Sequence, residues 1–288
     1  MQIQPATLSR KYINRESLEQ NKHRCDVWYT VYPDAIHQLI ADKKEKEVYG
    51  LTVVSAEKLF EKSLSELQSI LAAFEYAPGD FSNTHVVAVD PRYTFVPDAL
   101  FESQQPEGYL DLIQPKAKWN SVHYDRISAL QLVDVYQMSD LFFGAARLVF
   151  PGANVRHYAG ILAEAFLKTT VKNQPERLFV HFQEKGMDIF RYDNGKLVYH
   201  NYFPFEADTD IVYFILSVAE VMQFKSNQWE VMLSGNLASD NSLLALMKKY
   251  IPQVLLLKRQ DLWQVPALMR EIPEHQYFIE SAGLLCAS

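Results

Sequence analysis

The segment RLFVHFQEKGMDIFRYDNGKLVYHNYF, at Arg177–Phe203, predicts three strands joined by two tight turns. Glu184-Lys185-Gly186 supplies the first turn, and Asp193-Asn194-Gly195 is a strong hairpin signal for the second. Apolar residues then recur at helical spacing from Ile211 to Met222, with Asp208 or Thr209 expected as the cap. The remaining expected elements are a strand at Trp229–Leu233, a helix at Ser242–Tyr250 and a strand at Val254–Leu257.

The same order of elements begins again near Arg24, earlier in the chain. The strands expected there are Cys25–Val31, Ala35–Ala41, Val48–Val54 and Thr84–Val89, with a helix capped by Ser55 before the last of them. Three strands, a helix and a further strand, occurring twice, indicate an internal duplication. This order is that of a ribonuclease-H-like fold, so we predict an α/β protein built from two tandem ribonuclease-H-like halves.

The duplication also predicts the domain boundaries. We expect an N-terminal arm at 1–23, a first half at 24–173 and a second half at 174–288, with Asn173-Gln174-Pro175 as the junction. An inserted α+β subdomain is expected at about 92–138 in the first half. The arm is expected to be loosely ordered, and pairing at a sheet edge is the alternative.

Composition and charge limit the classes of function. The chain has 288 residues with 28 basic and 35 acidic side chains, so its net charge of −7 argues against a nucleic-acid partner. No apolar run is long enough to span a membrane, and the polar N-terminus lacks the core of a signal peptide. Cys25 and Cys286 show no metal or redox spacing, which favours a reducing compartment and a cytoplasmic location.

Three longer segments carry a resemblance to a known family. They are VVAVDPRYTFVPDALF at Val86–Phe101, YFPFEADTDIVYFIL at Tyr202–Leu216 and HQYFIESAGLL at His275–Leu285. Together they resemble the uncharacterised Bacteroidetes family called domain of unknown function 3822. The resemblance implies an actin-like ATPase arrangement of the two halves and no established activity. The place of the insertion resembles that of the cell-division and pilus-assembly branch of the actin-like superfamily.

The resemblance also suggests where a nucleotide would bind. Active members of the superfamily hold it in the cleft between halves, on turns that carry Asp and Gly. Here the first turn has Asp34 but no glycine, and Pro33 removes a backbone donor. The other turns give the remaining candidate nucleotide-binding residues, which are Glu184, Lys185, Gly186, Ser234, Gly235 and Asn236. Each turn keeps part of the signature, and Ser-Gly-Asn is equally a good strand-to-helix turn.

We therefore expect a non-catalytic actin-like scaffold or regulatory protein, with an unidentified protein partner and without a catalytic residue, metal or cofactor. The alternative is a divergent ATPase or small-molecule kinase that binds ATP with Mg²⁺. A nuclease is disfavoured, because Asp26 and Glu66 lack a third acid on the fourth strand. His181 and His200 are expected to approach each other across neighbouring strands, as packing residues rather than metal ligands.

Overall fold

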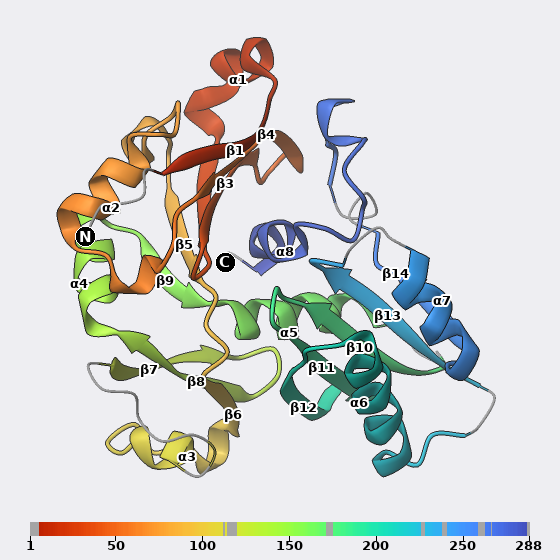
Figure 1. Cartoon of the computed structure of the whole chain (residues 1–288). Helices are drawn as coiled ribbons and strands as arrows, with labels where there is room; N and C mark the ends of the chain where they lie inside the picture. The colour runs from red at the N-terminus through yellow and green to blue at the C-terminus, as the bar shows by residue number, and fades with distance from the viewer. Residues whose placement is uncertain are drawn as a thin grey trace. The chain divides into compact units, whose positions relative to one another are not determined.

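The computed structural model describes residues 6–111, 113, 120–170, 175–225, 228–237, 241–258, 263–265 and 267–286. The chain divides into two compact units, shown in Figure 1. The first unit comprises Met1–Leu162, Trp263–Arg270 and Ala282–Ser288, and the second comprises Ala163–Leu262 and Glu271–Ser281. The chain therefore returns to the first unit twice after it has entered the second. The junction expected at Asn173-Gln174-Pro175 lies largely outside the described residues.

The sheet of the first unit has the strand order β1-β4-β3-β2-β5-β9. Its strands are β1 (Thr7–Ile13), β2 (Asp26–Val31), β3 (Ala35–Asp42), β4 (Glu47–Ser55), β5 (Thr84–Ala88) and β9 (Asn154–His157). β2, β3 and β4 form an antiparallel meander, whereas β5 pairs parallel with β2 and β9 pairs parallel with β5. These pairings are those expected when a hairpin meander is followed by crossover connections.

The sheet of the second unit repeats this topology, with the order β12-β11-β10-β13-β14. Its strands are β10 (Glu176–Phe182), β11 (Gly186–Asp193), β12 (Lys196–Pro204), β13 (Trp229–Gly235) and β14 (Gln253–Leu256). The first three strands are antiparallel, and β13 and β14 add in parallel beside β10. Both sheets thus share one strand order, and β1 is an addition to the first. The two tandem ribonuclease-H-like halves predicted from the sequence are confirmed.

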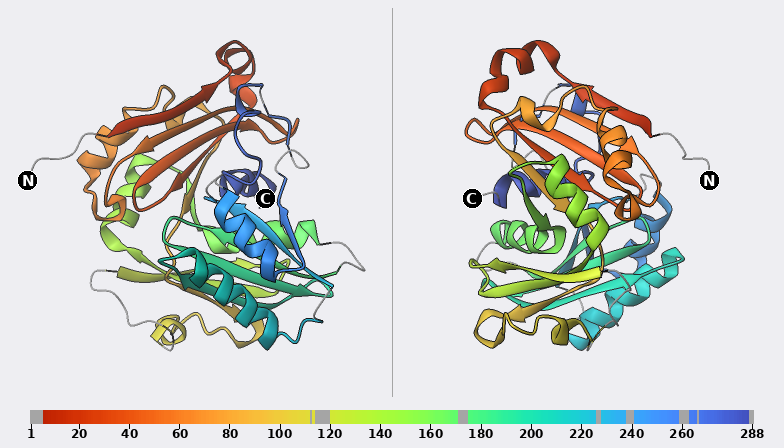
Figure 2. Two further views of the ribbon diagram at one scale, coloured as in Figure 1. Left: turned by 45° about the vertical axis from the view of Figure 1, so that its right-hand side comes forward. Right: turned by 90° about the vertical axis from the view of Figure 1, so that its left-hand side faces the viewer.

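The N-terminal residues extend the first sheet. β1 pairs antiparallel with β4 from Thr7 opposite Ser55 to Ile13 opposite Gly50, and its course along the sheet edge can be followed in Figure 2. Helix α1 (Arg15–Asn21) follows, with the side chain of Asn14 accepting a hydrogen bond from the amide of Ser17. The prediction of a loosely ordered arm is therefore wrong for this segment, and the alternative of edge pairing is what the structure has.

The insertion forms a sheet of its own, with the order β6-β8-β7. Its strands are β6 (Tyr93–Pro97), β7 (Asn120–Ile127) and β8 (Leu132–Ser139), and the short helix α3 (Glu107–Asp111) lies between the first two in sequence. A small apolar cluster joins these elements through Val96, Leu110, Val133 and Val135. The insertion is thus an α+β element within the first half.

Two helices begin at places that differ from the prediction. α2 (Leu64–Leu71) starts after Ser63, because Glu66 accepts a hydrogen bond from the Ser63 amide at 2.9 Å in a capping box, and Ser55 ends β4 instead. α6 (Asp208–Val221) is capped by Asp210, whose carboxylate accepts from the amide of Ala207 at 3.0 Å. The other helices are α4 (Asp140–Val149), α5 (Tyr158–Thr169), α7 (Asn241–Tyr250) and α8 (Phe278–Cys286).

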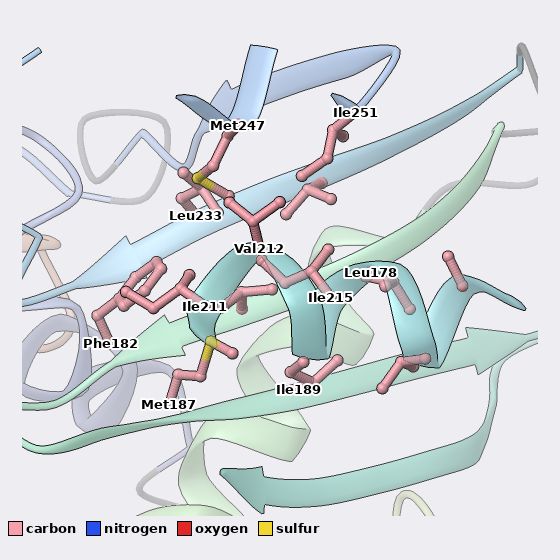
Figure 3. Packing of buried hydrophobic residues seen from close by; sticks show 14 of the residues in the cluster. Leu178, Phe182, Met187, Ile189, Ile211, Val212, Ile215, Leu233, Met247 and Ile251 are labelled. Carbon is pink, nitrogen blue, oxygen red and sulfur yellow. The ribbon is translucent and has the colours of Figure 1, made fainter. Parts of the chain in front are cut away.

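The core of the second half lies between its sheet and two helices. Figure 3 shows Ile211, Val212 and Ile215 of α6 pointing at side chains of β10, β11 and β13, with Met247 of α7 beside them. Burial of this apolar face, at roughly 25 cal/mol per Å², is what holds α6 on the sheet. Across the described part of the chain, no helix combines the length and apolar character needed to cross a membrane.

Candidate functional site

The second and third candidate turns lie at the same end of one sheet. β10 and β13 run parallel with Phe182 opposite Gly235, so the turns that follow these strands are neighbours. The amide of Asn236 donates to the carbonyl oxygen of Phe182 at 2.8 Å, which joins them directly. The structure therefore brings Glu184-Lys185-Gly186 next to Ser234-Gly235-Asn236. Asp34 belongs to the first unit, where it is exposed at the turn between β2 and β3.

The turn that contains Asp34 is bonded to its own half. The amide of Tyr32 donates to the carbonyl oxygen of Ala35 at 2.8 Å, and Pro33 has no amide hydrogen to offer. The carbonyl oxygens of Pro33 and Asp34 accept from the amides of Leu59 and Ala56 at 2.8 and 2.9 Å. Since phosphate binding requires several converging donors, this turn supplies little of what a phosphate needs.

Gly186 in the second turn lies under an aromatic ring. It is buried, and a β-carbon at this position would overlap the phenol group of Tyr202. The exposed residues of the turn are Glu184 and Lys185, while the amide of Gln183 bonds to the carbonyl oxygen of Gly186 at 2.8 Å. The requirement for glycine therefore arises from a neighbouring protein side chain, and it does not need a phosphate to explain it.

The third turn uses its polar groups within the second half. The amide of Gly235 donates to the carbonyl oxygen of His275 at 2.7 Å, and the amide of Asn236 is bonded to Phe182 as described above. Gly235 has a φ of +92°, in the region that favours glycine, and a β-carbon here would overlap the carbonyl oxygen of Phe182. Asn236 is exposed, whereas Ser234 is fully buried.

His181 and Ser234 form a hydrogen-bonded pair in the interior. The Nδ1 of His181 and the Oγ of Ser234 are 3.0 Å apart, with the two side chains 2% and 0% exposed. Burial lowers the pKa of His181 to about 4, although the carboxylates of Asp188 and Glu280 act to raise it. The imidazole is therefore neutral at pH 7. This hydrogen bond is closed off from solvent and links the side chains of β10 and β13.

Asp188 is a buried acid that the sequence analysis did not single out. It lies on β11, fully buried and opposite His181, and its Oδ2 accepts from the Nε2 of Gln183 at 2.9 Å. Because β11 separates β10 from β12, the prediction that His181 and His200 approach across neighbouring strands is wrong. His200 reaches the Oδ1 of Asp188 at 3.5 Å instead. Within the described ranges, no three His, Cys, Asp or Glu side chains are arranged to hold a metal ion.

A double-mutant cycle tests whether the Tyr202 ring is the reason that position 186 requires glycine. We expect Gly186→Ala to lower the free energy of unfolding by about 1–3 kcal/mol, because the added methyl group displaces the Tyr202 ring. In a Tyr202→Ala background the same substitution should have almost no effect, since the overlapping ring is gone. Urea denaturation of the four proteins measures both values. Equal losses in the two backgrounds would show that the ring is not the reason for the glycine.

The comparisons with known proteins agree with this architecture. The model for the family described as "Protein of unknown function (DUF3822)" matches residues 16–254. A solved protein from Bacteroides thetaiotaomicron, described as having an actin-like ATPase fold and unknown function, is 17% identical. It aligns over 93% of this chain and 98% of its own, with a TM-score of 0.77.

A second solved structure, a PilM–PilN type IV pilus biogenesis complex, is 12% identical. The alignment covers 90% of this chain and 96% of that one, with a TM-score of 0.53. The sequence has no significant match among curated proteins. Both structural likenesses show the actin-like fold, which agrees with the two halves described above. Since the family model spans most of the sequence, the chain belongs to the DUF3822 family of proteins of unknown function.

Proposed function

We propose that this protein is a non-catalytic actin-like scaffold or regulatory module, which acts by binding another protein. The observation that carries the proposal is the third turn, where the amides of Gly235 and Asn236 are both bonded to carbonyl oxygens of the second half. A nucleotide that used these amides would have to displace two formed hydrogen bonds, each worth about 1 kcal/mol net. These two hydrogen bonds join the turn to β10 and to the segment that contains His275.

The other two turns support the same proposal. The surface of Gly186 is covered by the Tyr202 ring, and Pro33 withholds a donor beside Asp34. Each of the three places where a relative would contact phosphate or adenosine is therefore altered. The likeness to PilM, which was solved in a complex with PilN, offers a precedent for an actin-like fold that serves in an assembly. Cys25 and Cys286 are buried and form no disulfide, which supports a reducing compartment such as the cytoplasm.

Nucleotide binding is the competing proposal, and one observation favours it. The second and third turns are adjacent, and the exposed Lys185 stands at the tip of the former. An ammonium group near two strand-end turns is suited to a phosphate. On this alternative the protein would be a divergent ATPase or small-molecule kinase that uses Mg²⁺ with ATP.

Thermal unfolding with nucleotides separates the two proposals. We expect 1 mM ATP with Mg²⁺ to leave the midpoint where Mg²⁺ alone leaves it, with ADP and GTP equally without effect. A ligand present at a hundred times its Kd would stabilise the folded protein by about 2.7 kcal/mol, which such a scan detects readily. A phosphate-release assay should likewise give no turnover.

Two charge-reversal variants make the result specific. Lys185→Glu changes the candidate phosphate contact, and Lys196→Glu makes the same change at another exposed lysine, at the start of β12. A rise in midpoint with Mg-ATP that Lys185→Glu abolishes and Lys196→Glu preserves would establish nucleotide binding at the second turn, and phosphate release with the same dependence on Lys185 would refute the non-catalytic proposal.

A further inference from the structure

His157 ends β9 and has an acceptor on each side of its ring. It is 0% exposed. Its Nδ1 lies 2.9 Å from the Oδ2 of Asp134, and its Nε2 lies 2.8 Å from the carbonyl oxygen of Asp90. A carboxylate oxygen and a backbone carbonyl oxygen can only accept. As long as Asp134 is ionised, both ring nitrogens must therefore donate, and only the doubly protonated imidazolium has two donors.

A neutral ring would fit this position badly. In either neutral tautomer, one ring nitrogen carries a lone pair instead of a proton. That nitrogen would face the ionised Asp134 or the Asp90 carbonyl oxygen without a hydrogen bond, in a site closed off from water. Burial acts to lower the pKa of His157, but the Asp134 carboxylate and the Asp90 carbonyl raise it by more, so the net direction is upward. The charge is compensated by Asp134, which is also fully buried.

Aromatic rings surround the pair. Tyr136 stacks on the imidazole with ring centroids 4.6 Å apart and planes within 11°, and Tyr93 and Tyr158 approach it at 4.8 and 4.7 Å. Such rings favour a cation through their electron-rich faces and keep water away. They strengthen the attraction between His157 and Asp134 by lowering the local dielectric.

The pair lies where the inserted sheet meets the first sheet. Asp134 belongs to β8 of the insertion, and its Oδ2 also accepts from the amide of Gly160 in α5 at 2.9 Å. The amide of His157 itself donates to the Oδ2 of Asp125, on β7 of the insertion, at 3.0 Å. Two strands of the insertion are thus bound to one short stretch of the first half through these two carboxylates.

The remaining charged groups around His157 are accounted for. The carboxylate of Asp90 turns to Arg92, with the Arg92 Nε 2.8 Å from its Oδ1. Burial raises the pKa of Asp125 to about 6, with Asp134 adding to the rise, while Arg156 and His157 oppose it. Tyr136 stays neutral, since burial raises its pKa well above the usual value. Asp134 is the charge that faces His157 directly.

We propose that His157 is a buried histidinium whose ion pair with Asp134 holds the inserted sheet against the rest of the first half. Loss of its proton weakens this contact, so the attachment of the insertion depends on pH. The proposal stands apart from the proposed function, since it concerns only the first half. A histidine whose pKa is raised on folding adds stability below its unfolded pKa of about 6.5, and that stability is lost as the pH rises through the folded value. Asp125 acts in the same direction at lower pH, because it too holds its proton more firmly in the folded protein.

Nitrogen NMR of the histidine rings tests the protonation state directly. At pH 6.5 we expect His157 to show both ring nitrogens protonated, with titration above that pH. Above the folded pKa, amide exchange of β7 and β8 should speed up by roughly a further tenfold per pH unit, beyond the intrinsic rise. A neutral ring at pH 6.5 would overturn the proposal, as would exchange of β7 and β8 that follows only the intrinsic rise.

Variants locate the effect. Asp134→Asn keeps an oxygen acceptor and removes the counter-charge, so the proton of His157 should be lost at a clearly lower pH. His157→Gln should open β7 and β8 to exchange at every pH and abolish the extra pH dependence. His123→Gln is the matched control, because His123 lies on β7 itself and its Nε2 is 3.0 Å from the Ser121 hydroxyl group, not from a carboxylate. An unchanged pKa of His157 in Asp134→Asn would refute the ion pair as the source of the charge, even if His157→Gln fails to fold.

Discussion

Gly235→Ala is expected to lower the free energy of unfolding by about 3–5 kcal/mol. Two costs add here, because the backbone at +92° disfavours any β-carbon and the new methyl group overlaps the carbonyl oxygen of Phe182. That oxygen is fixed, since it is backbone and accepts from Asn236. Urea denaturation followed by the fluorescence of the buried Trp229 in the same half measures the loss.

Gly152→Ala is the matched control for Gly235→Ala. Gly152 also has a positive φ, of +77°, but a β-carbon there meets nothing within 4 Å. Only the conformational cost of about 1 kcal/mol should appear. If the two substitutions cost the same, the close approach between the third turn and β10 would not be what demands glycine at 235.

Acidification is expected to remove about 3 kcal/mol of stability from the second half through His181. Burial lowers the pKa of His181 to about 4 in the folded protein, whereas an unfolded histidine titrates near 6.5. The unfolded chain therefore takes up the proton first. The contribution of neutral His181 to the free energy of unfolding is complete above pH 6.5 and is lost as the pH falls to about 4.

Urea denaturation at pH 7.0, 5.5 and 4.5 measures this loss. His181→Gln should be less stable at pH 7 and should lack this part of the pH dependence, because glutamine does not titrate. His23→Gln changes an exposed histidine and should leave the dependence as it is in the parent protein. A parent protein whose second half is equally stable at pH 7.0 and 4.5 would contradict the prediction.

The duplication was predictable because its signals are local. The Asp193-Asn194-Gly195 turn fixes the hairpin between β11 and β12, and the structure shows positive φ values at Asn194 and Gly195, as such a turn requires. Buried strands such as β2 and β10 are short apolar runs bounded by turns. From these features follow the order of strands and helices along each half and the place of the insertion.

Edges and helix starts were harder to predict, for physical reasons. β1 pairs on one side only, so it carries the exposed Arg10 and Lys11 where an inner strand would be apolar. Charged residues protect a sheet edge and also hide its strand character. At α2, both Ser55 and Ser63 are acceptable caps, and Glu66 three residues after Ser63 is what decides between them.

The candidate site shows what local reasoning omits. The sequence pointed to Gly186 and Gly235 as glycines near a phosphate, and the structure gives each of them a reason within the protein. The Tyr202 ring and the Phe182 carbonyl group each lie outside the turn whose glycine they contact, and no turn signal reveals them. The assignment of these turns to nucleotide stays a prediction.

The return of the chain to the first half has a consequence for folding during synthesis. Ala282–Ser288 is assigned to the first half, where the carbonyl oxygen of Cys286 accepts from Arg156 at 3.0 Å. Gly283 is packed there so closely that a β-carbon would lie 3.2 Å from the indole of Trp28. A ribosome makes these residues only after the whole span from Ala163 to Leu262. The half that is translated first is therefore completed last, and a nascent chain keeps the Trp28 side of it uncovered until α8 emerges.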